Sequence, residues 1–472
     1  MRGTPTKLAR FGALFIAVLL LATGCSFVTG SDSTGAPTTT IADTAPSGET
    51  TTTASATTTP TESTTAPDST AAPTVTVGAG VDPEVADRLV GEVDDLITAT
   101  EQLRGLEFLA TPTITILSTA ELADRVAADV ADELVPEDLA VDTRVYQLLG
   151  LLDPGASLDD MLVALYSEGV AGFYDGDTGE LVIGGEAADL SPYTKDVIVH
   201  ELVHALTDQN FIFNDDYQAM FDEQRYDEAA AFQALIEGDA TYFQYIYLQD
   251  MPLADQVSAA MEELDRLRAA PSYSTTPGWL LNDLSFPYET GRTFVADLVE
   301  SGGIAAVDEA YTNRPVSTEV VMHPARYEGG EEVLPVTPPE ITIDGFDTLE
   351  TSSYGEWGLR LLLTNAAPGV AVQAANGWGG DEYQILYDNK DVVLALAFKG
   401  DTTDDAFQMA DALQGLVASL GFGEPVASGG GVAYNAEDGR YAYLNRIGDG
   451  FVFVISTSAS AGAAAVDQMR VP

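Results

Sequence analysis

The sequence predicts an α+β protein, because helical and strand patterns occur in both halves of the chain. Two long stretches with helical periodicity lie at residues 193–209 and 227–249. A β-branched run at residues 111–117, and two apolar runs around a polar turn at residues 170–183, are typical of strands. The 472 residues, 46% of them hydrophobic, are enough to bury at least one large core.

The N-terminus has the layout of a bacterial lipoprotein signal peptide. Basic residues in the first ten positions precede an apolar run at residues 11–22, which is short for a membrane span. The run ends in Leu-Ala-Thr-Gly-Cys, which resembles the signal box whose cysteine receives the lipid. Cys25 is the only cysteine in the sequence. We therefore expect residues 1–25 to be a signal peptide, and Cys25 to anchor the protein on the extracytoplasmic face of the cell membrane.

Residues 26–80 are predicted to be a disordered tether. The segment consists mainly of Thr, Ser, Ala and Pro, with almost no large apolar residue. Such a composition cannot bury enough surface to offset the entropy of ordering the chain. The tether would hold the folded part away from the membrane.

The charge balance excludes some partners. The chain has 20 Lys+Arg against 74 Asp+Glu, a formal net charge of -54. A surface this acidic repels the phosphates of nucleic acids and anionic lipid headgroups. We therefore expect no nucleic-acid partner, and membrane contact through the lipid on Cys25.

The folded part is predicted to comprise two regions, divided near a Pro-Pro pair at residue 338. The first region, 81–339, contains the elements named above and two more helices, at residues 82–103 and 118–131. The second region, 340–472, is a smaller α+β region that packs on the first. Its clearest elements are two strands and a helix, at residues 391–398, 450–456 and 403–420.

The helix predicted at residues 193–209 carries the sequence HELVH. Its two histidines, His200 and His204, are four residues apart and share one face, so both imidazoles can reach one ion. Glu201 lies in the same polar sector, opposite the apolar side of the helix. The motif alone also fits a polar stripe that faces solvent, but it contains two of the 3 histidines of the chain.

A third metal ligand is predicted on the helix at residues 227–249. Glu237 lies beside Ile236 at the edge of an apolar stripe, where an unpaired carboxylate would be costly to bury. A metal ion removes that cost; the alternative is an ordinary, partly exposed glutamate. Gly238 is a poor helix former and predicts a place where another backbone approaches closely.

Two histidines and one glutamate are typical of a catalytic zinc site. They leave one position of a tetrahedral Zn²⁺ open for water, and the ion lowers the pKa of that water. Glu201 is then placed to take the proton and pass it to a leaving amine. Other first-row metals also fit this ligand set.

These motifs together resemble a known family. The sequences HELVHAL and EGDA, the pattern STE-x-x-x-HP at residues 317–324 and GWGGD at residues 377–381 are similar to segments of bacterial gluzincin-type metallopeptidases. The STE-x-x-x-HP and GWGGD segments resemble those of an uncharacterised secreted or lipoprotein branch. Gluzincins are HExxH zinc enzymes whose third ligand is a Glu on a following helix. The resemblance implies zinc-hydrolase chemistry, and a domain with an active-site helix and a mostly helical lower part.

His323, the third histidine, ends a short helix that Ser317 begins and Pro324 stops. One interpretation is that it donates a hydrogen bond to the oxyanion, as a histidine does in related gluzincins. The other is that this turn packs structurally near the site. Tyr327 is a second candidate for the donor role.

Three further features have both functional and structural interpretations. The hairpin at residues 170–183 fits an edge strand that pairs with an extended peptide, but any hairpin would give this pattern. Asp208, one turn after His204, fits a group that orients the imidazole, but we favour an ordinary helix-end carboxylate. Trp378 is expected to pack in the core.

The sequence therefore predicts an extracytoplasmic, membrane-anchored zinc metallopeptidase that hydrolyses a peptide or protein substrate. Zn²⁺ would be held by His200, His204 and Glu237, with Glu201 as general base and His323 as a second catalytic group. Two alternatives stay open: a catalytically silent, metal-binding lipoprotein that serves as a binding or scaffold module, and a zinc hydrolase of a non-peptide amide. The intact general base argues against the silent module.

Overall fold

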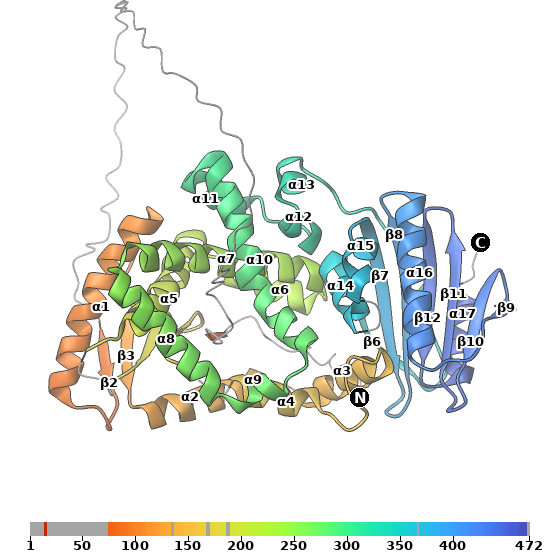
Figure 1. The fold of residues 1–472 in the computed structure, drawn as a ribbon, viewed down its shortest axis with the longest axis horizontal. Coiled ribbons are helices and arrows are strands. Elements are labelled where there is room, and N and C mark those ends of the chain that lie inside the picture. The colour runs from red at the N-terminus through yellow and green to blue at the C-terminus, as the bar shows by residue number, and fades with distance from the viewer. Residues whose placement is uncertain are drawn as a thin grey trace, which may run out of the picture.

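The structure, a computed structural model, describes residues 14–16, 74–133, 136–166, 170–185, 189–365 and 368–469. The predicted α+β class is confirmed, since numerous helices surround two separate sheets (Figure 1). Cys25, with most of the predicted signal peptide and tether, lies outside the described residues. Among the helices that are described, none is long and apolar enough to cross a membrane.

The first sheet is mixed and has the strand order β1-β4-β5-β3-β2. Strand β3 is parallel to β2 and β5, whereas β4 is antiparallel to β5 and to β1. Strands β4 and β5 form the hairpin predicted from the sequence. The strands are β1 (Leu14–Ile16), β2 (Val75–Val77), β3 (Thr113–Leu117), β4 (Gly172–Asp175) and β5 (Glu180–Gly184).

The described residues include a strand inside the segment predicted to be a tether. Strand β2 lies within the segment assigned to the tether, and its backbone pairs in parallel with residues 114–116 of β3. Alternating Thr and Val favour a strand. The average composition of residues 26–80 did not indicate this three-residue strand.

Helix α7 packs against α10 and against α5 in the centre of the first region (Figure 1). Apolar side chains from these helices, from α1 and from strands β3 to β5 form one buried cluster. Helices α5 and α7 correspond to the two long helices predicted from the sequence. The helices up to α10 are α1 (Pro83–Arg104), α2 (Thr119–Glu133), α3 (Pro136–Leu148), α4 (Leu158–Tyr166), α5 (Pro192–Phe211), α6 (Asn214–Asp222), α7 (Tyr226–Asp250), α8 (Leu253–Ala269), α9 (Pro271–Thr275) and α10 (Gly278–Gly302). The region continues with α11 (Ile304–Thr312), α12 (Thr318–Met322) and α13 (Pro324–Glu328).

Helices α7 and α10 approach each other most closely at two glycines. A Cβ atom on Gly238 would overlap the backbone carbonyl group of Gly291, and one on Gly291 would overlap the carbonyl oxygen of Ala234. Neither position therefore has room for a larger side chain. The close backbone approach predicted from Gly238 is confirmed.

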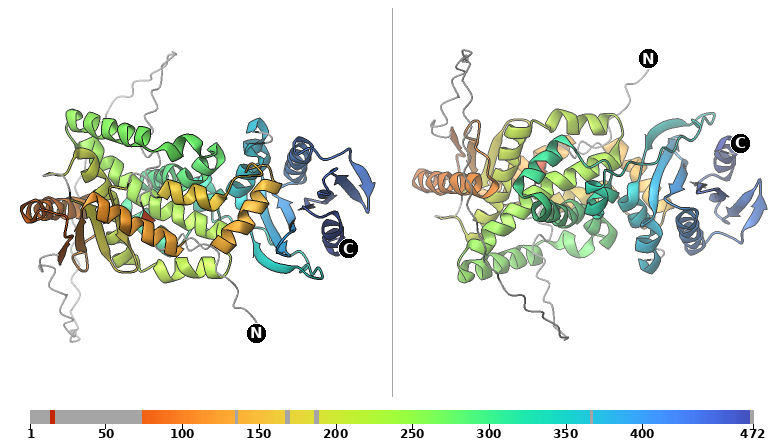
Figure 2. Two further views of the ribbon diagram at one scale, coloured as in Figure 1. Left: turned by 90° about the horizontal axis from the view of Figure 1, so that it is seen from below. Right: turned by 90° about the horizontal axis from the view of Figure 1, so that it is seen from above.

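The second sheet is antiparallel throughout, with the strand order β6-β7-β8-β12-β11-β10-β9. It lies at the opposite end of the molecule from the first sheet (Figure 2). Side chains alternate between its faces: Leu394 and Leu396 of β8 pack with α14, α15 and α16, whereas Val393 and Ala395 pack with α17. Strands β8 and β12 and helix α16 match the elements predicted for this region.

The elements of this region begin with β6 (Asp347–Ser352), α14 (Gly355–Thr364), α15 (Pro368–Ala375), β7 (Trp378–Tyr387), β8 (Val392–Gly400) and α16 (Thr403–Ser419). They end with β9 (Val426–Ser428), β10 (Gly431–Asn435), β11 (Tyr441–Ile447), β12 (Gly450–Ser456) and α17 (Ala459–Met469).

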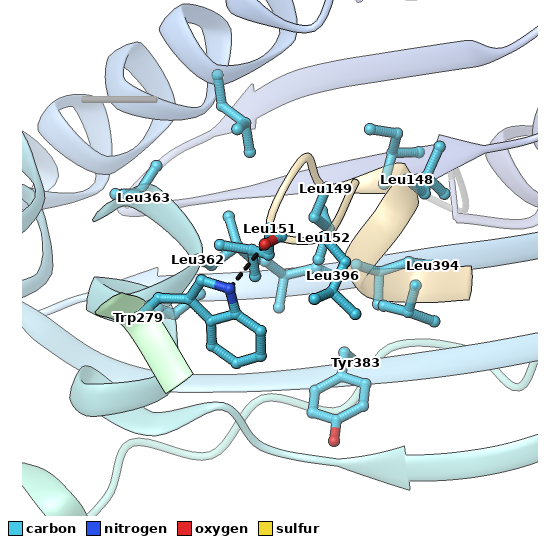
Figure 3. Packing of buried hydrophobic residues seen from close by; sticks show 14 of the residues in the cluster. Leu148, Leu149, Leu151, Leu152, Trp279, Leu362, Leu363, Tyr383, Leu394 and Leu396 are labelled. Atoms are coloured by element: carbon cyan, nitrogen blue, oxygen red, sulfur yellow. Dashed lines mark hydrogen bonds between the residues drawn. The ribbon is translucent and has the colours of Figure 1, made fainter. Parts of the chain in front are cut away.

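The two regions share a hydrophobic core (Figure 3). Leucines from the end of α3 and the turn after it meet side chains from the start of α10 and from α14, β7 and β8. Trp279 of α10 donates a hydrogen bond from Nε1 to the carbonyl oxygen of Leu151, at 2.7 Å. The residues labelled in Figure 3 are Leu148, Leu149, Leu151, Leu152, Trp279, Leu362, Leu363, Tyr383, Leu394 and Leu396.

A polar junction joins the second region to the first turn of α7. Asp227 accepts hydrogen bonds from the backbone N–H and the hydroxyl of Thr318, at 3.1 and 2.6 Å. The Thr318 hydroxyl in turn accepts one from the backbone N–H of Trp357 in α14, at 3.2 Å. The STE-x-x-x-HP segment therefore bridges α7 and α14.

The GWGGD segment stabilises the same junction. Asp381 accepts hydrogen bonds from the backbone N–H groups of Tyr354 and Gly355, at the start of α14, and from Nε1 of Trp378. The Trp378 side chain is 1% exposed, as expected for a core residue. Both segments that carry the family resemblance in this part of the chain thus act on the position of α14.

The contact between α7 and α10 predicts that Gly238→Ala destabilises the protein by about 1–3 kcal/mol, the usual cost of overpacking. Gly91→Ala is a matched control, because Gly91 is an exposed residue within α1 and a Cβ there meets nothing within 4 Å. That control should gain about 0.5–1 kcal/mol from reduced chain entropy. Thermal unfolding of both variants measures the difference. Equal melting temperatures would contradict the close packing.

The junction predicts a pH-dependent stability. Burial raises the pKa of Asp227 to about 7, although the hydrogen bonds from Thr318 oppose the shift. The folded protein then binds more protons than the unfolded chain at intermediate pH, so stability falls as the pH rises from about 4 to 7. Asp227→Asn removes this loss, and its melting temperature relative to wild type should rise between about pH 4 and pH 7. For Asp215→Asn, at an exposed position of α6, the difference in melting temperature from wild type should be the same at every pH. If the difference in melting temperature between Asp227→Asn and wild type were also the same at every pH, the raised pKa of Asp227 would be refuted.

Candidate metal centre

Helix α5 begins at a well-defined cap and carries the HELVH sequence into the interior. The Ser191 hydroxyl accepts a hydrogen bond from the backbone N–H of Thr194, and Pro192 occupies the first helical turn. The side chains of the motif are almost entirely inaccessible: His200 is 3%, Glu201 0% and His204 1% exposed. A polar stripe facing solvent is therefore excluded.

The three predicted ligands meet between α5 and α7. The Nε2 atoms of His200 and His204 lie 2.9 Å apart, and each lies 3.2 Å from Oε2 of Glu237. Glu237 is 2% exposed, so it is not an ordinary surface glutamate. Metal–ligand bonds of about 2.1 Å in a tetrahedron place neighbouring ligand atoms about 3.4 Å apart. The donor atoms thus have nearly the spacing that a zinc ion requires, and the residues fit a metal.

The protonation states also suit metal binding. Burial by itself would raise the pKa of Glu237, but the two histidines outweigh it and lower the pKa to about 2. Burial lowers the pKa of His204, which favours the neutral imidazole. An ionised carboxylate and a neutral imidazole are the forms that bind metals.

Glu201 is held at one oxygen and free at the other. Its Oε2 accepts a hydrogen bond from the backbone N–H of Tyr174 in β4, at 2.9 Å. Its Oε1 is buried and finds no hydrogen-bond partner among the described residues. Burial, together with the nearby Glu237, raises the pKa of Glu201. A fixed carboxylate with one unsatisfied oxygen is suited to bind and deprotonate a small polar molecule.

Asp208 fixes the strand that contacts Glu201. It accepts hydrogen bonds from the hydroxyl of Tyr174 and from Nδ2 of Asn214, both at 2.9 Å. These contacts link the end of α5 to β4 and to the start of α6. They agree with the preferred interpretation of Asp208 as a carboxylate near the end of the helix.

Tyr288 of α10 is a site residue that the sequence analysis missed. Its ring stacks near His200 with the centroids 6.1 Å apart, and Glu237 lies close enough to its hydroxyl to influence the pKa of that group. Burial, reinforced by Glu237, raises the pKa of Tyr288, so the hydroxyl keeps its proton. No sequence motif marks this residue. The small Gly291, three residues later, is the one local sign that α10 approaches α7 closely.

A second omission is a pair of polar residues behind His200. Nδ1 of His200 lies 3.1 Å from Oε1 of Gln244, and Nε2 of Gln244 donates to Oδ2 of Asp196 at 2.9 Å. Asp196 precedes His200 by four residues, and Gln244 follows Glu237 by seven. Both spacings return to the same helix face and could have indicated this contact.

The EGDA sequence of α7 can be explained residue by residue. Glu237 contacts the histidines, and Gly238 allows the close approach of α10. Asp239 pairs with the fully buried Arg104 of α1 at 2.9 Å and accepts a hydrogen bond from the Tyr311 hydroxyl at 3.0 Å. A buried ion pair therefore fixes α7 two residues beyond Glu237.

His323 and Tyr327 have partners outside the three-residue cluster. Nε2 of His323 lies 2.9 Å from Oε2 of Glu356 in α14, and the Tyr327 hydroxyl donates to the carbonyl oxygen of Asn313. The junction to which His323 belongs binds α7 at Asp227, ten residues or about 15 Å along the helix from Glu237. The structure thus favours the structural interpretation over an oxyanion contact. The sequence of the STE-x-x-x-HP motif gave no information about which part of α7 it contacts.

A second group of acidic side chains is an ion-pair cluster. Glu319, Glu331 and Asp401 lie close enough together to suggest a cation. Nη1 of Arg326 lies among them, at 3.1, 2.6 and 3.0 Å from an oxygen of each. The guanidinium group already supplies the positive charge, so this cluster does not suggest a metal.

Comparisons with known proteins describe the second region alone. A family model described as a domain of unknown function (DUF8575) matches residues 344–467. This range begins close to the boundary predicted at residue 340 and contains all seven strands of the second sheet. No curated protein and no solved structure matches the chain.

The geometry of the cluster predicts that the protein binds about one zinc ion per chain and that His204→Ala loses it. His323→Ala is the matched control, since the third histidine contacts Glu356 instead. It should keep its zinc. Metal content measured by mass spectrometry on purified, refolding-competent protein distinguishes the variants. Loss of zinc in both variants, or in neither, would contradict the assignment.

Proposed function

We propose that the protein is a zinc-dependent hydrolase that cleaves peptide bonds. The observation that carries the proposal is Glu201 beside the His200, His204 and Glu237 cluster, with one oxygen unsatisfied. A zinc ion held by the three ligands would supply a Lewis acid and a water of lowered pKa. A metal site with a purely structural role has no use for such a base, which argues against a silent scaffold.

Several residues would have distinct roles at the proposed site. The backbone N–H of Tyr174 fixes Oε2 of Glu201, which leaves Oε1 to accept the proton of the attacking water and return it to the leaving amine. The hydroxyl of Tyr288 is a donor beside the cluster and is suited to stabilise negative charge on the carbonyl oxygen. Burial of the whole cluster excludes bulk water and strengthens these interactions.

Strand β4 supports a peptide as the substrate. Its outer edge carries β1, a short extended segment in antiparallel register, with Tyr174 opposite residue 15. The same Tyr174 contacts Glu201 through its backbone N–H. An extended peptide in the place of β1 would therefore lie beside the general base, with its backbone paired to the strand.

The remaining predictions from the sequence complete the proposal. The gluzincin-type fold agrees with a helix pair that carries HExxH and a downstream glutamate. The lipoprotein signal sequence supports a location on the extracytoplasmic face of the membrane, through a lipid on Cys25. A non-peptide amide would react by the same chemistry, but the pairing edge of β4 favours a peptide.

Glu201→Gln tests the catalytic assignment. The variant should keep its zinc, because the three ligands are intact, and should hydrolyse peptides about 10²–10⁴-fold more slowly than wild type. A broad peptide library analysed by mass spectrometry provides both the substrate and the rate, with His204→Ala as the control without metal. Hydrolysis at the wild-type rate by Glu201→Gln, with zinc bound, would eliminate this mechanism.

A further inference from the structure

The polar groups behind His200 form a continuous relay between the two central helices. Asp196 and His200 lie one turn apart on α5, and Gln244 lies two turns beyond Glu237 on the facing side of α7. The hydrogen bonds run from His200 to Gln244 and from Gln244 back to Asp196, at 3.1 and 2.9 Å. Helix α7 thus contacts His200 twice, through Glu237 in front and Gln244 behind.

We propose that Asp196 is a positioning residue that acts through Gln244 to select the metal-binding tautomer of His200. This inference rests on the proposed metal centre and adds to it. Asp196 is 5% exposed and makes no contact with the cluster itself. It influences the ligand through the orientation of one amide group.

The chemistry of the amide explains the selection. A glutamine side chain has a donor nitrogen and an acceptor oxygen, which point in different directions. Oδ2 of Asp196 accepts, so the nitrogen of Gln244 faces Asp196 and the oxygen faces His200. An acceptor at Nδ1 requires the proton of the neutral imidazole to be on Nδ1. The lone pair is then on Nε2, the atom that faces Glu237 and His204.

The relay works whether or not Asp196 is charged. Burial, with a smaller contribution from Glu263 of α8, raises the pKa of Asp196 to about 7 against the hydrogen bond from Gln244. Its Oδ1 is buried and has no hydrogen-bond partner within the described part of the chain. A proton can therefore reside on Oδ1 while Oδ2 still accepts from Gln244.

A glutamine in this position also orients His200 without adding a charge next to the imidazole ring. A carboxylate bonded directly to a metal-binding histidine makes the imidazole more basic. Here the carboxylate is one side chain further away and a neutral amide contacts the ring. The relay therefore fixes the orientation of His200 without placing a full negative charge beside it.

Zinc affinity measured by chelator competition tests the relay without any assay of hydrolysis. Asp196→Leu, which removes the acceptor for Gln244, and Gln244→Leu should each weaken zinc binding about 10–100-fold, the usual effect of losing a group that orients a ligand. The two changes combined should cost little more than one, because both interrupt the same relay. Glu92→Gln is the control: Glu92 supports the start of α5 through Leu190 and Lys195, outside the relay, and the variant should bind zinc like wild type.

The decisive variant exchanges the two chemical groups. In the double substitution Asp196→Asn with Gln244→Glu, the new amide donates to the new carboxylate, which again accepts from Nδ1 of His200. Zinc affinity should return to within a few-fold of wild type, an outcome that a purely space-filling role does not give. Thermal unfolding of the metal-free variants verifies that each one is folded.

Three results would overturn the proposal. Asp196→Leu could bind zinc as tightly as wild type, which would show that Gln244 needs no acceptor at position 196. The exchanged pair could bind zinc no better than Gln244→Leu alone, which would show that the order of donor and acceptor is irrelevant. Absence of zinc binding in the folded wild type would remove the metal centre itself and the relay with it, and only this result would also refute the proposed function.

Discussion

The buried contacts of helix α7 are the constraint on which the rest of the structure depends. Along its 25 residues, α7 binds Thr318 of the polar junction at Asp227, the histidines at Glu237, α10 at Gly238, Arg104 at Asp239 and His200 again at Gln244. A buried polar group without a partner costs about 1–3 kcal/mol. All these groups are therefore satisfied at one rotation of α7 about its axis and one position along that axis. The neighbouring helices and strands pack around α7 in that placement.

The sequence predicted the parts of the site that lie on one helix face or at the edge of an apolar stripe. His200, Glu201 and His204 follow from helical spacing, and Glu237 follows from the cost of burying a lone carboxylate. Tyr288 could not be predicted, because it comes from α10 and no local pattern specifies which distant helix covers the cluster. For His323 the difficulty was the same: its helix cap was predicted correctly, but its partner Glu356 lies in the other region.

The high content of acidic residues has a structural consequence inside the protein. Several carboxylates at the junction between the regions are buried, and burial raises the pKa of Asp227 to about 7, of Asp381 to about 6 and of Glu319 to about 8. Each is stabilised by local donors: the Thr318 hydroxyl, the Trp378 indole and Arg326, respectively. The junction is thus held by hydrogen bonds to groups that are protonated easily. The chain has few basic residues to pair with them.

These contacts also connect the second region to the candidate site. The first helix of that region, α14, bonds to Thr318, and Thr318 bonds to Asp227 in the first turn of α7. A helix is stiff over the roughly 15 Å that separate Asp227 from Glu237. The position of α14 is therefore tied to that of α7 by direct hydrogen bonds through Thr318. The shared leucine core beside α10 opposes any displacement of α14.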